Sequence, residues 1–471
     1  MAGKDPTTTR ENRFIEAGVI LIACLIAVLS AHWYAGAWND GSRLATVESL
    51  VDRHTLAIDD SIFVRVPPSG PLPYSPDEPL LLEHGTGDKL LIDGHYYSDK
   101  SPVPALFMAG IYQALQSTAG LSAQTQTDRF CYVMTLCSSG LAYVVAVYCV
   151  YRMGRPLRLP TSLCLLLTAS FALATVALPY AQFANNHILF LAVTAFMMLT
   201  LAGIETLPPL RLGTLAGLGY TFDLGAGPVL LVCAFALVAW RCRHWKPVLW
   251  FGLAAIPWLV LHHTINYATG GTFKPANAVA EYLDWPGSSF NSQNMTGVVN
   301  HTLGHFLTYA AALLFGKRGF VGHNLALFLV VPAVVQLIRR RIREWPEVAF
   351  AVAWCGGTWL AYALTSNNYS GLCCSIRWFV PFLAPAYFVL AIFLREQPRF
   401  AGDFAILSVW GAVLAVIMAW QGPWMKHLVP FFWPIQGLAL LNWLGYRFWQ
   451  RRRARQADLA VSFLPSLSNA A

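Results

Sequence analysis

The chain has 471 residues, of which 56% are hydrophobic and only 12% are charged. Soluble domains carry about 25% charged residues, so this composition excludes a soluble globular protein and indicates a multi-pass helical membrane protein. The net charge of +8 comes from basic residues in short connections between apolar runs, where they orient helices; this placement excludes nucleic-acid binding. The ten cysteines lack metal-ligand or redox spacing, and we interpret them as small core residues.

The N-terminal region predicts a membrane anchor followed by a long loop. Residues 1–13 are polar and basic, and an apolar run follows from Phe14. A cleaved signal peptide has a shorter apolar core, so we interpret 14–34 as a retained transmembrane helix with a cytoplasmic N-terminus. Residues 35–127 then form a large external loop that gathers many of the acidic side chains. Within it, the spacing of Leu44, Val47, Leu50 and Val51 predicts a helix along the membrane surface.

Apolar runs of roughly twenty residues mark the remaining membrane spans. They cover 128–151, 160–180, 187–203, 247–267, 320–338, 347–366, 376–394, 402–420 and 426–446. Residues 212–240 are interrupted by "TFDLGAGP" and predict two short helices. The sequence therefore predicts an all-α bundle of about twelve transmembrane helices over 128–446 with the first helix. An external loop over 268–300 and a basic cytoplasmic tail over 447–471 complete it.

Basic clusters test this topology. They comprise Arg152, Arg155 and Arg158, then Arg339, Arg340, Arg341 and Arg343, and finally Arg447 with Arg451, Arg452, Arg453 and Arg455. All of them lie on the cytoplasmic side only if the apolar stretch 103–118 does not cross the membrane. We therefore predict that 103–118 is a helix lying in, or dipping into, the outer face.

Two motifs bracket the long loop. Asp40 and Arg43 form a D-x-x-R pattern just after the first helix, and "YYSDKSP" ends the loop at Pro102. This pair resembles the GT-C glycosyltransferases that use polyprenyl-phosphate sugars, among them the lipid A aminoarabinose transferases and bacterial relatives of the protein O-mannosyltransferases. Those families carry D-E-x-R-Y and Y-x-E/D-K-P-P at these places. The chain departs from them at Gly41, which replaces an acid, and at Ser101, which replaces a proline.

Three later segments are similar to further parts of these families. They are "ALPYAQFANNHILF", "FGKRGFVGHNLALF" and "NYSGLCCSIRWFVPFLAP". The resemblance implies a GT-C fold in the cytoplasmic membrane, with an active site on the external face. It also implies an enzyme that moves a sugar from a polyprenyl-phosphate donor to an acceptor, which is a glycolipid, a cell-envelope polymer or a protein.

Such a transfer needs a carboxylate to orient or deprotonate the acceptor and cations to stabilise the departing phosphate. We predict Asp40 as the catalytic residue and Lys100, Arg318 and Arg377 as the donor phosphate ligands. The predicted substrate pocket comprises Arg43, Tyr97, Asp99, Asn186, His187 and Tyr369. No cluster has metal-ligand spacing, so no metal or other cofactor is expected, although the reaction is compatible with a divalent metal. The expected partners are the donor, membrane lipids and an unidentified acceptor.

Alternatives remain open at each position. Asp40 fits a helix-end cap for residues 42–44, Arg318 and Arg377 fit snorkelling to lipid headgroups, and Asp223 fits a residue that satisfies the backbone at a helix break. Asn186 and His187 fit interfacial polar residues. A transporter or flippase of a lipid-linked sugar is the alternative function, disfavoured because no internal repeat is visible. A membrane scaffold with partner surfaces at 268–300 and 366–376 is a third candidate function.

Overall fold

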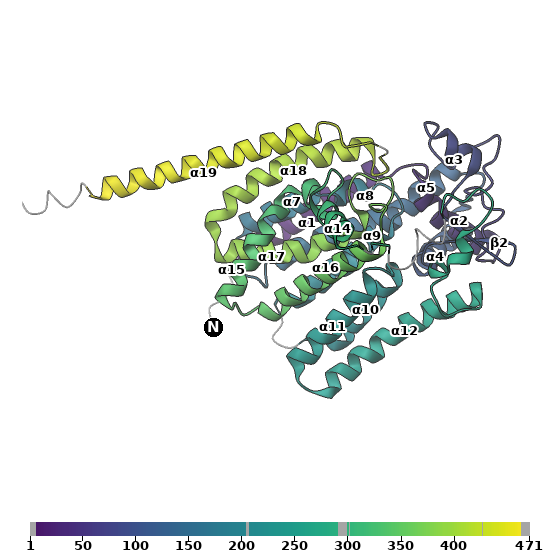
Figure 1. The fold of residues 1–471 in the computed structure, drawn as a ribbon, viewed down its shortest axis with the longest axis horizontal. Helices are drawn as coiled ribbons and strands as arrows, with labels where there is room; N and C mark the ends of the chain where they lie inside the picture. Colours follow the sequence, from purple (N-terminus) through teal and green to yellow (C-terminus); the bar gives the residue numbers. More distant parts are fainter. Residues whose placement is uncertain (1–5, 204–206, 291–298, 301, 426, 463–471) are drawn as a thin grey trace, which may run out of the picture.

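The computed structural model describes residues 6–203, 207–290, 299–300, 302–425 and 427–462 (Figure 1). Residues 1–5, 291–298 and 463–471 lie outside the described residues, and with them parts of the predicted N-terminal segment, external loop and tail. Helices make up most of the fold. The first half contains α1 (Pro6–Ser30), α2 (Trp38–Asp52), α3 (Pro79–His84), α4 (Pro102–Ala119), α5 (Thr127–Thr135), the π-helical turn η1 (Leu136–Gly140), α6 (Leu141–Met153), α7 (Thr161–Leu173), α8 (Ala177–Tyr180) and α9 (Asn186–Leu201).

The second half is also helical. It contains α10 (Pro209–Phe222), α11 (Gly227–Cys242), α12 (Trp245–Gly270), α14 (Leu303–Phe315), α15 (Val330–Arg340), α16 (Trp345–Thr365), α17 (Leu383–Glu396), α18 (Ala401–Gln421) and α19 (Phe432–Ser462), with 3-10 turns η2 (Ala276–Ala278), η3 (Ala280–Leu283), η4 (Val321–His323), η5 (Leu325–Leu329), η6 (Arg377–Phe382) and η7 (Pro398–Phe400). The predicted break inside 212–240 is present between α10 and α11.

Six helical stretches of the described chain are long and apolar enough to cross a membrane. They are Arg13–Ser30, Thr127–Met153, Trp245–Gly270, Trp345–Thr365, Arg377–Glu396 and Pro398–Gln421. Each coincides with a span expected from the sequence, so the prediction of a mostly helical protein with several membrane-spanning helices is confirmed. The number of about twelve spans stays a prediction.

The predicted span 320–338 is not one helix, and a neighbouring helix was missed. Residues 321–329 form two 3-10 turns before the short α15. Asn324 stabilises this irregular backbone, because its side chain accepts from the Val176 N–H at 2.9 Å and donates to the Phe320 carbonyl at 2.7 Å. The missed helix is α14, whose thirteen residues are too few for a membrane-span pattern.

Ion pairs fix which helix ends lie together. Glu16, near the start of the apolar stretch of α1, binds Arg152 in the last turn of α6 at 2.8 Å and Arg155 just after α6 at 2.7 Å. Helix α4 runs along α2, with Gln116 bonded to Asp52 at 2.7 Å. Helix α4 thus lies with α2 at one end of the molecule (Figure 1). That 103–118 does not cross the membrane stays a prediction.

The 35–127 segment folds at one end of the molecule, where α2, α3, α4 and β2 gather opposite the free end of α19 (Figure 1). Helix α2 is not a surface helix as predicted. Twelve of its fifteen residues are buried. Several of its polar side chains are hydrogen-bonded within the fold; Ser42 Oγ, for example, donates to the Asp88 carbonyl at 2.6 Å.

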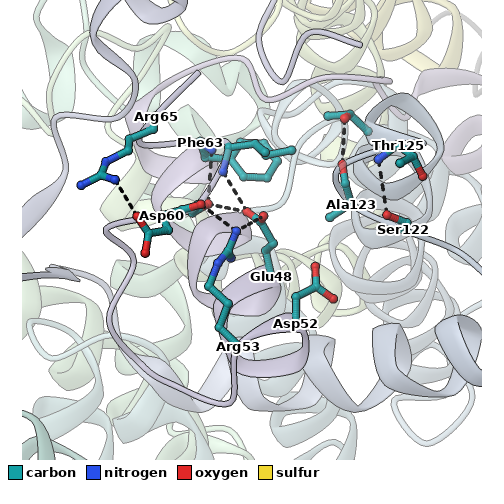
Figure 2. A network of polar contacts seen from close by, with 12 residues as sticks. Glu48, Asp52, Arg53, Asp60, Phe63, Arg65, Ser122, Ala123 and Thr125 are labelled. Atoms are coloured by element: carbon teal, nitrogen blue, oxygen red, sulfur yellow. Dashed lines mark hydrogen bonds and ion pairs between the residues drawn. The ribbon is translucent and has the colours of Figure 1, made fainter. Parts of the chain in front are cut away.

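Glu48 anchors the chain that follows α2 (Figure 2). Its carboxylate is fully buried and accepts from Arg53 Nη2 at 3.0 Å, Ser61 Oγ at 2.5 Å and the Ile62 N–H at 3.1 Å. Arg53 Nη2 also donates to the Asp60 carbonyl at 2.6 Å. Because a buried carboxylate is costly unless its oxygens are bonded, this network sets the path of the loop beneath α2.

A two-stranded hairpin corrects the all-α expectation. Strand β1 (Lys89–Ile92) pairs antiparallel with β2 (His95–Ser98), with Leu90 opposite Tyr97. Asp93 and Gly94 form the two-residue turn with φ of 50° and 84°. An Asp-Gly pair between apolar residues is the usual signal for such a turn, so the sequence carried a signal for this hairpin that was missed. Asp99 and Lys100 follow directly after β2.

Candidate active site

A cavity of about 460 Å³ lies where the 35–127 segment meets the bundle. Its wall combines residues of α2, the chain after β2, the start of α9, the α10–α11 break, the end of α16 and η6. It encloses six of the ten predicted site residues, which are Arg43, Asp99, Lys100, Asn186, His187 and Arg377. These side chains come from segments far apart in sequence, so the fold converges on them.

Lys100 is held by two carboxylates. Its Nζ lies 2.6 Å from Asp88 Oδ2 and 2.6 Å from Asp99 Oδ2. Asp99 Oδ1 is buried without a hydrogen-bond partner among the described residues. Burial raises the pKa of Asp99, while the Lys100 ammonium opposes that rise. Asp99 therefore keeps one buried carboxylate oxygen without a partner in the described part of the chain, at the wall of the cavity.

Arg43 supplies a buried cation from the second turn of α2. It is 3% exposed, and its Nη2 donates to Asn186 Oδ1 at 2.7 Å. Asn186 in turn donates to the Phe222 carbonyl at 2.7 Å, which ties α9 to the end of α10. Burial lowers the pKa of Arg43 to about 10, so the guanidinium is charged at neutral pH. Its Nε and Nη1 have no hydrogen-bond partner in the described part of the chain.

Arg377 supplies a second unpaired cation at the start of η6. Its guanidinium carbon lies 5.6 Å from the centre of the Trp424 ring, within cation–π range. It forms no ion pair with a described carboxylate, and its buried Nε has no hydrogen-bond partner there. Its backbone N–H donates to Ser370 Oγ at 3.0 Å. Arg377 is thus positioned by the preceding turn and leaves its charge available to the cavity.

Arg318 and Tyr369 lie behind that turn and outside the cavity wall. Tyr369, Ser370 and Gly371 have successive positive φ of 51°, 64° and 85°, so the chain turns sharply before Arg377. Arg318 Nη1 donates to the Gly371 carbonyl at 3.0 Å, and the Tyr369 ring packs 4.8 Å from that of Tyr309. Both residues support the turn in this structure. Their predicted roles at phosphate and substrate stay predictions.

Asp223 joins the far wall of the cavity, although the sequence suggested only a backbone-satisfying role. Its Oδ1 accepts from the N–H groups of Gly225 and Ala226 and from Tyr362 Oη, each at 2.9 Å. Its Oδ2 lies 3.2 Å from His187 Nδ1. Asp223 therefore caps the α10–α11 break and also lies beside His187, whose Nδ1 has no hydrogen-bond partner among the described residues. Tyr362 was missed, since nothing in its local sequence marks it.

Asp40 lies outside the cavity wall. It is 1% exposed, and its Oδ2 and Oδ1 accept from the backbone N–H groups of Gly36 and Ala37 at 2.6 and 2.9 Å. A carboxylate in the first turn that binds preceding N–H groups is a capping interaction. Asp40 therefore binds back to the N–H groups that precede α2, and it is not the expected cap of residues 42–44. The predicted catalytic role of Asp40 stays a prediction without a contact to support it.

Tyr97 lines a smaller adjoining cavity of about 30 Å³. Asp99, Lys100 and Ser101 belong to both walls and separate the two spaces. On the far side, Ser101 Oγ lies 3.5 Å from His262 Nδ1. Among the described residues, no group of three or more His, Cys, Asp or Glu side chains is placed to hold a metal ion. The expectation of no metal therefore stays a prediction.

Comparisons with known proteins give no family assignment from sequence. No family model matches the chain, and no curated protein matches it. Three solved structures are similar at 12–14% identity. ArnT from Cupriavidus metallidurans bound to undecaprenyl phosphate has a TM-score of 0.48, over 86% of this chain and 70% of that one. Two structures of the Archaeoglobus fulgidus oligosaccharyltransferase have TM-scores of 0.46 and 0.45, over 88% and 87% of this chain.

One of these oligosaccharyltransferase structures is an apo form, and the other holds an inhibitory peptide and a dolichol-phosphate. The chain spans 56% of their length. Because the identities are low and the TM-scores lie below 0.5, we argue the function from the side chains of this chain alone.

Proposed function

We propose that this protein is a membrane glycosyltransferase that transfers a sugar from a polyprenyl-phosphate donor to an acceptor at the outer face of the cytoplasmic membrane. One observation carries the proposal. Arg43 and Arg377 face the same cavity without a described carboxylate partner, beside the Lys100 ammonium. A guanidinium without an ion-pair contact in a partly desolvated space favours an anion of matching geometry, and phosphate binds arginine through two parallel hydrogen bonds.

The position of the cavity fits a lipid-linked donor. It lies at the ends of membrane-length helices such as α16 and beside the folded 35–127 segment. A polyprenyl phosphate has its phosphate at the membrane boundary and its chain among the lipids. Arg43 and Arg377 would hold that phosphate and stabilise the charge that develops on it as the sugar departs.

Asp99 is the carboxylate that fits the role of general base in this cavity. The acceptor hydroxyl or amine attacks the anomeric carbon, and the bond from that carbon to the phosphate oxygen breaks. The acceptor proton passes to Asp99 Oδ1, and polyprenyl phosphate leaves with the bonding electron pair. Burial raises the pKa of Asp99, which makes its carboxylate a better proton acceptor near neutral pH. Lys100 fixes the orientation of Asp99 through its other oxygen.

The phosphate site is tested by binding of undecaprenyl phosphate to the purified full-length chain. We expect Arg377→Gln to weaken binding by about tenfold or more, since a charge-assisted hydrogen bond contributes about 1.5–3 kcal/mol. Arg129→Gln is the matched control: Arg129 lies in α5 and lines a different groove. Equal affinities for wild type and Arg377→Gln would contradict the proposal.

The chemical step is tested with a panel of undecaprenyl-phosphate-linked sugars and membrane glycolipid extract, with label counted in the acceptor. We expect Asp99→Asn to lower kcat by about 100-fold or more, with donor binding retained, and Asp40→Asn to reduce it far less. A larger loss of kcat in Asp40→Asn than in Asp99→Asn would assign the general base to Asp40. Movement of the labelled donor across vesicles without transfer to any acceptor would support the flippase alternative instead.

A further inference from the structure

A second large cavity lies at the opposite end of the bundle, about 900 Å³ in volume. Its wall is built from the α6–α7 connection, the ends of α9, α11, α15 and α17, and the start of α16. The start of α9 and the end of α16 line the first cavity, and the opposite end of each helix lines the second. At 1.5 Å per residue they separate the two cavities by about 24–31 Å, which is about the thickness of the hydrocarbon layer.

The arginines of this second cavity differ in how they are neutralised. Arg395 binds Glu344 through two bonds of 2.7 and 3.0 Å and Glu396 at 2.9 Å. Arg241 lies 3.6 Å from Glu347. Arg158 and Arg340 line the same cavity and form no ion pair with any described carboxylate. The cavity thus contains two arginines whose charge is left for a ligand.

The backbone conformation at Arg158 also supports a ligand site in this cavity. Arg158 has a φ of 58°, in the left-handed region that glycine adopts more easily than any other residue. An arginine that occupies a strained position at the rim of a basic cavity suggests a use for its side chain. Leu201, Ala202 and Ile342 give the cavity an apolar wall next to the arginines. A ligand with a phosphate and an attached apolar part fits this combination.

We propose that this cavity binds the headgroup of an anionic phospholipid, with Arg158 and Arg340 on the phosphate. Basic cavities between transmembrane helices on the cytoplasmic side suit such headgroups. The site is separate from the proposed transferase cavity, and its occupancy would stabilise the ends of the six segments that meet there. Binding of a ligand to the folded state alone raises stability as ligand concentration rises.

The test measures the thermal unfolding midpoint of the purified full-length chain in phosphatidylcholine nanodiscs that contain increasing phosphatidylglycerol. We expect the midpoint of the wild type to rise with phosphatidylglycerol. The double variant R158G/R340Q should need about tenfold more lipid for the same rise. Glycine relieves the left-handed conformation at position 158, so the variant should unfold like the wild type in phosphatidylcholine alone. R340Q by itself gives an independent second measurement.

The control is R452Q/R453Q, which removes the same charge from exposed positions on α19 outside the cavity. It should respond to phosphatidylglycerol like the wild type. An unchanged response in R158G/R340Q would overturn the site. An equal rise produced by millimolar inorganic phosphate in pure phosphatidylcholine would assign the cavity to a soluble anion and overturn the lipid. Neither result bears on undecaprenyl phosphate binding at the other end, so the two proposals fail separately.

Discussion

Asp40 and Arg43, one turn apart on α2, show how burial assigns different tasks to two charged residues. The Asp40 carboxylate turns back to the N–H groups of Gly36 and Ala37, whereas the Arg43 guanidinium reaches α9 and the cavity. The D-x-x-R pattern alone cannot separate these tasks, because the direction of each side chain depends on the chain preceding α2. Of the two residues in the pattern, Arg43 lines the cavity and Asp40 does not.

The Asp40 carboxyl should make stability depend on pH. Burial raises its pKa from 3.8 to about 7, against the opposing N–H bonds of Gly36 and Ala37. A carboxyl with a raised folded pKa binds its proton more tightly when folded. Its contribution is therefore complete below pH 3.8 and is lost as pH rises toward about 7. The loss is at most about 1.4 kcal/mol per pH unit within that window.

Asp40→Asn removes this titration while keeping a side-chain acceptor. We expect the difference in unfolding midpoint between wild type and Asp40→Asn to fall as pH rises from about 5 to about 7 and to level off above that. Thermal unfolding of both proteins in the same detergent, across pH, measures it. The subtraction removes the titration of all other groups. A constant difference over the whole range would show that Asp40 stays ionised in the folded state.

At the scale of the element, the α2 helix explains why Gly41 replaces the acid found in the resembled families. A Cβ at position 41 would overlap the buried Tyr74 ring, whose Cε1 and Cζ would lie 2.9 Å away. Tyr74 is fixed in place because its hydroxyl donates to the Phe63 carbonyl at 2.6 Å. The departure from the motif is thus a packing solution, in which a tyrosine of the loop closes over the helix.

Gly41→Ala should therefore destabilise the protein by about 1–3 kcal/mol, the usual cost of overpacking. The control is Gly110→Ala at an exposed position of α4, where an added Cβ meets no atom within 4 Å; it should stabilise by a few tenths to about 1 kcal/mol through helix propensity. Denaturant unfolding measures both. In a Tyr74→Leu background the cost of Gly41→Ala should shrink. An undiminished cost there would show that Tyr74 is not the source of the clash.

The elements also show what hydropathy can predict. Helices α1, α12, α16 and α18 follow from uninterrupted apolar runs, because a span of that length satisfies its own backbone in lipid. The 320–338 run failed as a helix, since Asn324 satisfies a broken backbone from its side chain. The His187–Asp223 pair and the Tyr362 contact could not be predicted, because they depend on helix packing between segments distant in sequence.

At the scale of the whole molecule, charge divides the two ends. The acidic 35–127 segment lies at one end of the molecule and the free end of α19 at the other (Figure 1). The proposed transferase cavity adjoins the 35–127 segment, whereas the Arg-rich cavity is lined by the opposite ends of α9 and α16. The sequence predicted this division from the positive-inside rule, which requires the basic clusters to share one side. The ion pairs of Glu16 support that grouping from the folded structure.

This division predicts a topology that labelling can test. Ser69 is exposed within the 35–127 segment and Ala454 is exposed on α19, so single Ser69→Cys and Ala454→Cys variants report the two ends. With arginine-rich loops in the cytoplasm, a membrane-impermeant maleimide should label Ser69→Cys in intact cells and Ala454→Cys only after permeabilisation. Unmodified protein corrects for the ten native cysteines. Labelling of both sites from the same side would contradict the opposed ends, and labelling of Ala454→Cys alone would invert the membrane orientation and place the proposed transferase cavity in the cytoplasm.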